Sequence, residues 1–456
     1  MRMRSDPTKL KTLLTVVLLL SGAGLTVVLV NNTQSAFAYQ STGIAIDFGN
    51  RDVQWVDADF KEYDDPIKIL EYACNAVGYE LVIEDNKVTE INGIPNDEEK
   101  TWNFWVVETE ELNWTKLVDT DVDISEYSVS TWAFCGENEA PTVGVDQFGR
   151  SIYGYPQAKK IVTLSPSITE ILGSLNATNA IVGADKYSNY PDAVAEGKKN
   201  GDIVEIGDYV NPSFELIMKS NPDLVLCDGS LYAHYELAER VRKTTVNSIV
   251  LYAGESIDTI LDNVYIVGVV MGYEIRSADV IDLLGSAESE ILDLIGMNQT
   301  DSKSTLVSLS ATKAPWVSGS NTYVDDILNR LQSENVFSSS YGWIQSNSEL
   351  IAKANPDVAI IITDDYLATE SEYETMLNNM SAEWKQTDAY KNGQIYLLSG
   401  GLAEMAQLPG PRYAQLMEII TLILYQDVLF PDDPIPYYIG DNYRDFLTIT
   451  EYLGFE

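Results

Sequence analysis

The sequence predicts an α/β protein with two Rossmann-like lobes bridged by a long helix. A small α+β domain and an N-terminal signal or anchor segment precede the lobes. Three observations predict this fold: strand–helix alternation from Lys160 onward, one helix–strand unit that occurs twice, and strand-like runs before residue 150. Such alternation is typical of parallel sheets with helices on both faces. The 456 residues, 45% of them hydrophobic, suffice for two or three domains.

The sequence of residues 1–38 is typical of a signal peptide or a membrane anchor. Basic residues precede an apolar run from Leu13 to Val30, and Ala36-Phe37-Ala38 fits a small-x-small cleavage site. The run is about 18 residues long, which lies between the usual lengths of a signal peptide and a spanning helix. Both alternatives stay open, and both place Tyr39 onward outside the cytoplasm. No cysteine stands directly after the run, which leaves a bacterial lipoprotein anchor unsupported.

Residues 41–150 predict the small α+β domain. Polar turns separate strand-like runs, and one helix is expected over "DPIKILEYACNAVG" (65–78), with proline near its start and glycine at its end. The chain has 3 cysteines, too few for a disulfide framework. Cys74 and Cys135 could pair outside the cell and close this domain, or both could be free thiols.

Residues 158–273 predict the first lobe, 274–300 the linking helix, and 301–456 the second lobe with a C-terminal extension. Within the lobes, apolar runs typical of buried strands alternate with amphipathic helical segments. The expected strands include "KIVTLS", "AIVGAD", "PDLVLCD", "NSIVLYA", "STLVSLS", "PDVAIIIT" and "GQIYLLS".

The segments "PSFELIMKSNPDLVL" and "SNSELIAKANPDVAI" are two copies of one unit: a short helix, Asn-Pro-Asp, and a buried strand. Each copy carries a glutamate, Glu215 or Glu349, in a Glu-x6-Pro-Asp pattern. Both glutamates fall near a helix start, where the helix dipole favours a carboxylate. On this evidence alone, they are acids on a solvated face.

A resemblance adds a functional interpretation. "KIVTLSPSITEILGSLNATNAIVGADKYSNYP", taken with the two Glu-x6-Pro-Asp units, resembles substrate-binding proteins of ABC importers, in the group that binds vitamin B12, haem and ferric siderophores, and most of all its vitamin B12-binding members. The resemblance runs from about Lys160 to about Val428. It implies two lobes bridged by a rigid helix and a ligand held between them. It also implies that Glu215 and Glu349 contact arginines of a dimeric permease.

The small domain resembles, more loosely, the C-terminal domain of transcobalamin and intrinsic factor. "DPIKILEYACNAVGYEL", "VTEINGI" and "WNFWVVE" carry this resemblance. In those carriers the domain caps one face of cobalamin. The resemblance therefore favours a corrinoid as the ligand, and no other cofactor is expected.

A corrin is a wide, mostly apolar disc with amide edges, so its site needs aromatic walls and few charges. The resemblance places Tyr187, Tyr209, Tyr232, Trp316 and Trp343 at such a site, on loops where α/β proteins bind ligands. The alternative for each is an aromatic surface anchor. The chain has 27 tyrosines and only 8 tryptophans, so the two tryptophans are the more informative candidates.

His234 is the only histidine, and it is either a ligand to cobalt or iron or an ordinary polar residue. One histidine argues against a zinc or manganese uptake protein, and no metal site is expected. Arg412 opens the last long helical segment, where it either supports local structure or reaches the ligand.

Charge and motifs narrow the function classes. The net charge of −40 disfavours nucleic acid and anionic lipid as partners. The sequence has no G-x-S-x-G, H-E-x-x-H or P-loop motif, so an enzyme is not expected. The leading hypothesis is an exported protein that captures a corrinoid and hands it to an ABC permease. The alternatives are a haem or ferric-siderophore binder and a cell-surface interaction protein.

Overall fold

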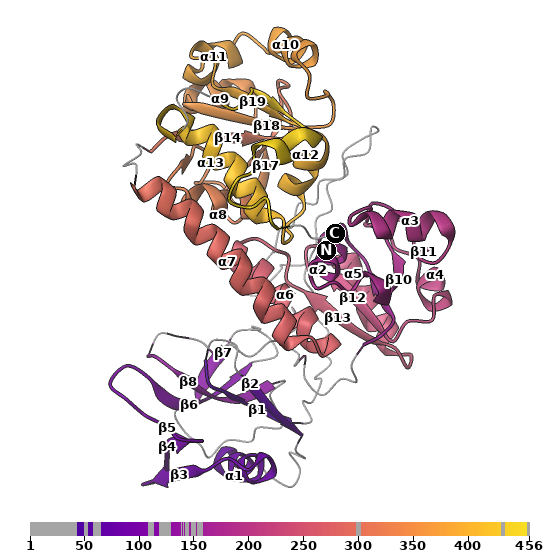
Figure 1. Cartoon of the computed structure of the whole chain (residues 1–456), viewed down its shortest axis with the longest axis vertical. Coiled ribbons are helices and arrows are strands. Elements are labelled where there is room, and N and C mark those ends of the chain that lie inside the picture. The colour runs from indigo at the N-terminus through magenta and orange to yellow at the C-terminus, as the bar shows by residue number, and fades with distance from the viewer. Residues whose placement is uncertain are drawn as a thin grey trace, which may run out of the picture.

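A computed structural model describes residues 43–49, 53–57, 65–107, 114–117, 129–137, 158–297, 302–429 and 434–453, and the single residues 139, 141, 146 and 152. The expected signal or anchor segment lies outside these residues. Within them, none of the helices has the length and apolar character needed to span a bilayer. Figure 1 shows three bodies: the small domain and two α/β lobes, with the long helix α7 running along the lobes.

The small domain is built on a five-stranded sheet of order β2-β1-β8-β6-β7, in which β1 and β8 are parallel and the other pairs antiparallel. A three-stranded sheet, β3-β4-β5, and one helix complete it. The elements are β1 (Gly43–Asp47), β2 (Val53–Asp57), α1 (Pro66–Val77), β3 (Leu81–Glu84), β4 (Lys87–Ile91), β5 (Ile94–Pro95), β6 (Thr101–Val107), β7 (Trp114–Leu117) and β8 (Val129–Cys135).

Helix α1 forms where the sequence predicts it. The Asp65 carboxylate accepts the backbone N–H of Ile67 at 2.7 Å and so caps the first turn, which Pro66 occupies without losing a hydrogen bond. Gly78 ends the helix in the left-handed conformation, at φ 77°. The buried face of α1 packs on Trp102 and the aromatic side chains beside it.

The disulfide that the sequence left open is not formed, because Cys74 and Cys135 are both free and buried. Side chains alternate between the two faces of a strand. Trp132 of β8 therefore packs in the core with α1 and Cys74, whereas Cys135 packs on the other face with Trp105. The two thiols belong to different clusters, so the sheet separates them.

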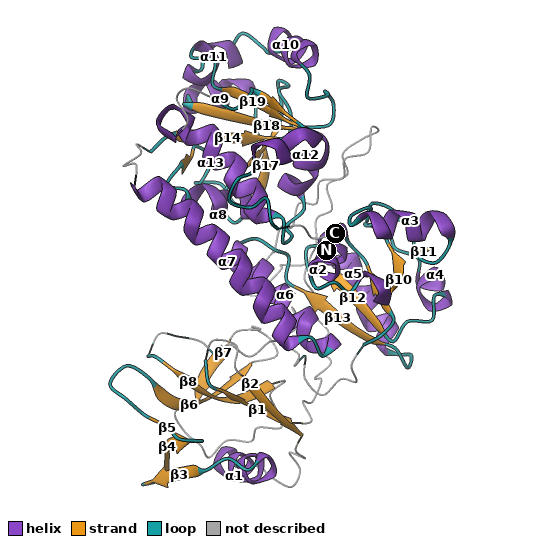
Figure 2. Ribbon diagram, in the orientation of Figure 1, coloured by secondary structure: helices purple, strands orange, loops and turns teal. Residues whose placement is uncertain are grey.

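The first lobe is a parallel sheet of order β11-β10-β9-β12-β13 with helices on its faces (Figure 2). Its elements are β9 (Ile161–Thr163), α2 (Pro166–Ser174), η2 (Thr178–Ala180), β10 (Ile181–Ala184), α3 (Asp192–Asn200), β11 (Val204–Glu205), α4 (Phe214–Lys219), β12 (Leu224–Asp228), α5 (Tyr232–Arg242) and β13 (Asn247–Leu251). Every residue of β9 and β12 is buried, which explains their unbroken apolar sequence.

Two consecutive helices join the lobes: α6 (Ile257–Met271) and α7 (Glu274–Met297). Ser256 and Thr259 form a capping box at the start of α6, and Gly272 ends it at φ 70°. The chain then turns directly into α7. The second lobe adds α8 (Tyr323–Arg330), whose Arg330 contacts Asp258 of α6 at 3.0 Å and Glu288 of α7 at 2.7 Å.

The sheet of the second lobe has the order β17-β15-β14-β18-β19-β20, with β16 also paired to β14. Strands β15 and β17 run antiparallel to their neighbours, and the other pairs are parallel. The elements are β14 (Ser304–Ser308), β15 (Trp316–Ser318), β16 (Glu334–Asn335), β17 (Trp343–Gln345), α9 (Ser348–Ala354), β18 (Val358–Ile362), α10 (Glu370–Asn379), η3 (Trp384–Gln386), α11 (Asp388–Lys391), β19 (Ile395–Leu398), α12 (Gly400–Gln407), α13 (Tyr413–Leu429), β20 (Tyr438–Ile439) and η4 (Asp441–Phe446).

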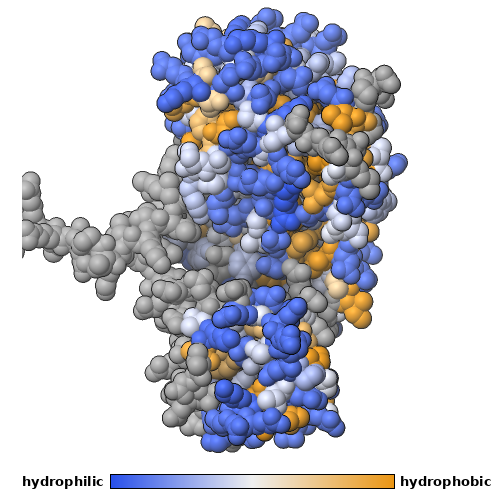
Figure 3. All heavy atoms as spheres, turned by 90° about the vertical axis from the view of Figure 1, so that its left-hand side faces the viewer, coloured by the Kyte–Doolittle hydropathy of each residue, from blue (hydrophilic) through white to orange (hydrophobic). Residues whose placement is uncertain are grey.

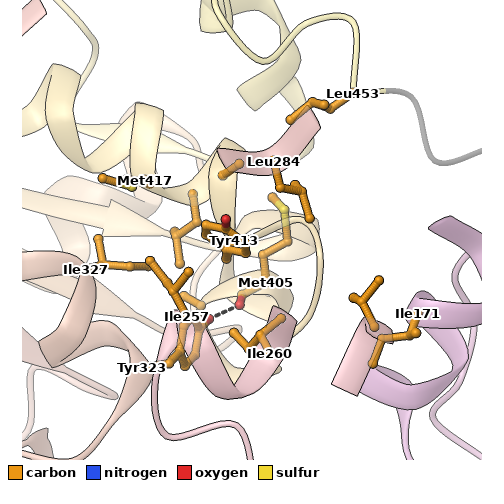
Figure 4. Packing of buried hydrophobic residues seen from close by; sticks show 14 of the residues in the cluster. Ile171, Ile257, Ile260, Leu284, Tyr323, Ile327, Met405, Tyr413, Met417 and Leu453 are labelled. Atoms are coloured by element: carbon orange, nitrogen blue, oxygen red, sulfur yellow. Dashed lines mark hydrogen bonds between the residues drawn. The ribbon is translucent and has the colours of Figure 1, made fainter. Parts of the chain in front are cut away.

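One core cluster runs through both lobes and the helices between them. It contains Ile171 of α2, Ile260 of α6, Leu284 of α7 and Tyr413 of α13. Figure 4 draws part of it, including the hydrogen bond from the Tyr323 hydroxyl to a carbonyl of α12. The surface contrasts with this interior: on the face in Figure 3, hydrophilic residues dominate and apolar ones are scattered. Such a surface agrees with a net charge of −40.

The segment before the first lobe is fixed to it at two points. Asp146 is buried and pairs with Arg242 at the end of α5 at 3.2 Å. Ile152 belongs to the core cluster that both lobes share. The chain therefore contacts the first lobe at Asp146 and Ile152, ahead of the first strand of that lobe.

Candidate ligand-binding site and docking surface

An aspartate stands at or just after the carboxyl end of β10, β11 and β12: Asp185, Asp208 and Asp228. In each case one carboxylate oxygen accepts the backbone N–H two residues further on, at 2.8, 3.0 and 2.8 Å. Such a bond folds the chain into a tight turn. The carboxyl ends of parallel strands share one edge, so these turns form one surface, here called the N-lobe rim.

The other oxygen of two of these aspartates holds a tyrosine from the preceding loop. The Tyr187 hydroxyl donates to Asp208 at 3.1 Å, and the Tyr209 hydroxyl donates to Asp228 at 3.4 Å. Burial and the Asp208 carboxylate raise the pKa of Tyr187, while burial and the charge of Asp228 raise that of Tyr209. Each O–H thus donates to a carboxylate, and the Tyr209 hydroxyl also lies 2.8 Å from the Ser230 hydroxyl.

His234 braces the same rim. The backbone N–H of Asp228 donates to Nδ1 at 3.0 Å, so the proton of the neutral ring is on Nε2, which donates to the Tyr209 carbonyl at 2.8 Å. The ring is fully buried, and burial lowers its pKa. Both nitrogens are used, so of the two sequence interpretations the structure favours the polar residue over the metal ligand.

The remaining sequence candidates fall into two groups. Tyr232 begins α5 at the N-lobe rim and is half-buried. Trp316 and Trp343 were expected on loops, which is wrong, because they lie on the neighbouring strands β15 and β17, where Trp316 pairs with Gln345 and Ser318 with Trp343. Residues in register share a face, so both indoles lie on one face of this ribbon, half-buried against the shared core cluster. The indole N–H of Trp316 is buried and has no hydrogen-bond partner among the described residues.

Tyr341 is a residue that the sequence reasoning missed. It precedes β17, its side chain is 58% exposed, and its hydroxyl accepts an N–H of Asn321 at 2.8 Å. Partial burial and the charge of Glu255, which follows β13 in the other lobe, raise its pKa. It therefore stands where the lobes approach each other. The available signal was a tyrosine two positions before Trp343 in a Ser- and Gly-rich loop.

The strongest contact between the lobes joins Glu170 of α2 to Arg412, just before α13. The two carboxylate oxygens accept the backbone N–H and the Nε of Arg412, both at 2.7 Å. Both side chains are buried, and the guanidinium lies 3.9 Å from the ring centre of Tyr190. Burial alone would lower the pKa of Arg412, but Glu170 holds it above its usual range. Sequence reasoning expected local support from Arg412 and missed its partner.

The surroundings of the rims are acidic. Asp208, Asp228 and Glu255 stand on the N-lobe rim, while Asp364 and Glu404 follow β18 and β19 in the second lobe. Burial raises the pKa of Glu255 and of Glu404. The buried Arg412 is already neutralised by Glu170, and a Glu404 oxygen lies 3.9 Å from its guanidinium.

The two copies of the repeated unit have the same local structure. Glu215 and Glu349 are each exposed in the first turn of a helix, α4 or α9, whose capping side chain is Ser213 or Asn347. An isoleucine two positions on is buried in each copy. Each helix starts at the same edge of its sheet as the rim, because it runs antiparallel to the strand that follows.

The copies differ in their partners. Glu215 pairs with Arg240 at 3.3 Å, and that guanidinium also lies 3.8 Å from the ring centre of Phe214. The backbone N–H of Glu215 itself and the charge of Arg240 lower the pKa of Glu215. Glu349 forms no ion pair within the part of the chain that the structure describes.

Two α/β lobes joined through helices, with aromatic rims at the strand ends, define a class of two-lobed binding proteins. A model of the periplasmic binding protein family matches residues 161–400, and the chain belongs to that family. The fold class expected from the sequence is confirmed. The match lies within the lobes and leaves the small domain and the C-terminal extension outside it.

Relatives agree with this placement. The chain is 26% identical over 276 residues to an uncharacterized ABC transporter substrate-binding lipoprotein, YvrC, of Bacillus subtilis, covering 59% of this chain and 81% of the relative. It is 21% identical to a cobalamin-binding protein of Halobacterium salinarum, covering 57% and 68%. A periplasmic heme binding protein of Pseudomonas aeruginosa has the same fold, with a TM-score of 0.51, 18% identity and coverage of 61% and 95%.

Proposed function

We propose that this chain is an extracytoplasmic substrate-binding protein that captures a corrinoid between its lobes and delivers it to an ABC transporter permease. One observation carries the choice of ligand: the N-lobe rim combines aromatic side chains with the carboxylates of Asp208 and Asp228, and the buried Arg412 is already paired. A neutral, amide-edged corrin suits such a surface because stacking and hydrogen bonding hold it without counter-charges.

The same charges disfavour the two alternatives. Haem carries two propionates, and ferric siderophores are commonly anionic. Two like charges 4 Å apart cost about 4 kcal/mol at an effective dielectric constant of 20. Haem iron also needs an axial ligand; both nitrogens of His234 are engaged in hydrogen bonds, so a tyrosine such as Tyr341 would have to supply it. A haem or ferric-siderophore binder of the same transporter class remains the second candidate, supported by the haem-binding relative of known fold.

We further propose that Glu215 and Glu349 dock the protein on a permease dimer. The two acids occupy equivalent positions, one per lobe, and both are exposed in a first helical turn. Two equivalent carboxylates suit a partner with two equivalent arginines, because charge-assisted hydrogen bonds fix orientation as well as affinity. Docking through Glu215 requires a permease arginine to displace Arg240.

The small domain is proposed as a transcobalamin-like module that contacts the same corrinoid. Its α1 and the aromatic side chains of β6 form one core, so the segments that carry the resemblance belong to one folded unit. Residues 1–38 are proposed as the export signal, either cleaved or retained as a membrane anchor.

Calorimetric titration of the chain from Tyr39 onward with cyanocobalamin, cobinamide and haemin tests the ligand. We expect sub-micromolar affinity for a corrinoid and weaker binding of haemin. Tight binding of haemin alone would reverse the assignment while leaving the family intact. A second titration without residues 39–150 tests the small domain, and corrinoid affinity should fall if it contacts the ligand.

A further inference from the structure

The chain continues after α13, and residues 435–453 form a segment that we name the C-terminal strap. Five apolar side chains of this segment are buried in the core cluster that both lobes share: Ile435, Ile439, Tyr443, Leu447 and Leu453. The family match ends at residue 400, well before this segment. Its burial shows that it is part of the folded core of the lobes.

The strap first extends the sheet of the second lobe. Strand β20 pairs in parallel with β19, and the N–H groups of Leu397 and Ser399 donate to carbonyls of the strap at 2.8 and 3.0 Å. The chain then passes the start of α12, where the Asp441 carboxylate accepts the N–H of Gly401 at 2.8 Å. The segment is thereby fixed to β19 and to the start of α12.

Glu418 of α13 then holds the strap with both carboxylate oxygens. One oxygen accepts the N–H and hydroxyl of Thr448 at 2.7 and 2.9 Å and the N–H of Ile449 at 2.9 Å. The other accepts the N–H and hydroxyl of Thr450 at 2.8 and 2.6 Å. Glu418 is 2% exposed, so five donors stabilise a carboxylate that has left water.

The strap ends at α13. Gln415 of α13 donates to the Leu453 carbonyl at 3.3 Å. The Leu453 side chain, labelled in Figure 4, belongs to the shared cluster. The strap thus connects the sheet edge, α12 and α13.

The strap contacts the start of α13, which directly follows the ion pair between the lobes. Gln415 and Glu418 lie in the first two turns of α13, directly after Arg412. Arg412 reaches across to Glu170 and Tyr190 of the other lobe. Tyr443 of the strap and Tyr190 pack against the same cluster. Any shift of the first turns of α13 therefore moves the group that joins the lobes.

We propose that the C-terminal strap positions Arg412 against Glu170 and so fixes the separation of the two lobes. With the strap bound, the braced ion pair adds to the connection that α6, α7 and the shared core make between the lobes. With the strap released, the arginine is unbraced, and the lobes sample a wider range of separations. The inference concerns lobe motion and holds for any ligand.

Spin labels on Glu215→Cys and Glu349→Cys in the full-length chain report the separation of the two lobes directly by pulsed electron–electron double resonance. The 3 native cysteines are buried, so the labels react selectively at the two exposed positions. Glu418→Ala removes the acceptor of five hydrogen bonds. Thr448→Val with Thr450→Val is a milder variant that removes only two hydroxyl donors and keeps the carboxylate. Glu451→Gln, an exposed change in the same segment, is the matched control.

We expect the Glu418→Ala distance distribution to broaden by a factor of about two and the control to match the parent, because loss of local contacts widens the accessible ensemble. Faster hydrogen exchange at residues 448–450 verifies that the strap is released. Released amides with an unchanged distance distribution would overturn the proposal. If circular dichroism shows that Glu418→Ala does not fold, the double threonine variant decides by the same two measurements.

Discussion

Glu170 in the first lobe holds Arg412 of the second through two hydrogen bonds of 2.7 Å, one to the backbone N–H and one to Nε. The same carboxylate thus fixes both the chain and the side chain of its partner. Because α2 and α13 belong to different lobes, this pair links their relative position to one buried charge interaction.

Removing one member of this pair should destabilise the protein strongly. Arg412→Met keeps the backbone N–H bond to Glu170 but leaves the buried carboxylate without its counter-charge, and we expect a loss of about 3–5 kcal/mol in the free energy of unfolding. Glu170→Leu combined with Arg412→Met should recover most of that loss. Denaturant titration measures both. Lys391→Met, which breaks an exposed pair with Asp388, is the control and should change stability by less than about 1 kcal/mol. An unchanged stability in Arg412→Met would contradict the inference that this buried pair stabilises the folded protein.

His234 should make stability fall in mild acid. Burial holds the pKa of His234 in the folded protein below its ordinary value of about 6.5, so the unfolded chain binds the proton more readily. The neutral ring therefore contributes its full stability above about pH 6.5, and this contribution is lost as the pH falls from there through the folded pKa. His234→Gln removes the titration. The comparison is the difference in unfolding free energy between parent and variant at several pH values from 8 to 5. A difference that stays constant across this range would argue against a buried neutral imidazole.

Charge reversal of the two exposed glutamates should separate ligand binding from transport. Glu215→Arg with Glu349→Arg leaves the rims intact, so ligand affinity measured by calorimetry should match the parent. Uptake by cells that carry the cognate permease should be abolished, because two attractive contacts become repulsive. Glu290→Arg with Glu374→Arg, which changes exposed acids on α7 and α10, is the control with the same change in net charge. Normal uptake by the double variant would remove the docking role.

The net charge of −40 should make stability depend on salt. Raising KCl from about 0.1 to 1 M shortens the Debye length from about 10 to about 3 Å and screens repulsion among the 69 acidic residues. The melting temperature should therefore rise with KCl. An uncharged osmolyte at matched osmolality is the control, and an equal rise in both solutions would point to solvent exclusion in place of screening.

Local signals in the sequence were sufficient for the fold class and the repeated unit. Asn-Pro-Asp ends a helix and begins a buried strand in both copies, and Asn221 and Asn355 take the left-handed conformation at φ 53° and 49°. The residues that begin and end α1 were predicted from the sequence in the same way. These features depend on neighbours in sequence, which a sequence displays.

Contacts between segments that are distant in the sequence could not be predicted. Glu170 and Arg412 are 242 positions apart, and no periodicity connects them. The Cys74–Cys135 pairing was left open because spacing does not reveal which face of β8 a residue occupies. Tyr341 and the C-terminal strap were missed for the same reason, because the role of each depends on residues that are distant in the sequence. For the aromatic candidates, the structure shows where they lie, and their contact with ligand stays a prediction.

The anchoring of Asp146 to Arg242 has a consequence for the small domain. Its last strand ends at Cys135, so the connection to the anchored residue spans at most about 40 Å when fully extended. A connecting segment this short keeps the domain beside the lobe at an effective concentration on the order of millimolar. Even a feeble affinity for a molecule held in the lobes would then produce nearly complete engagement, whereas the same domain supplied as a separate chain would need millimolar doses to do so.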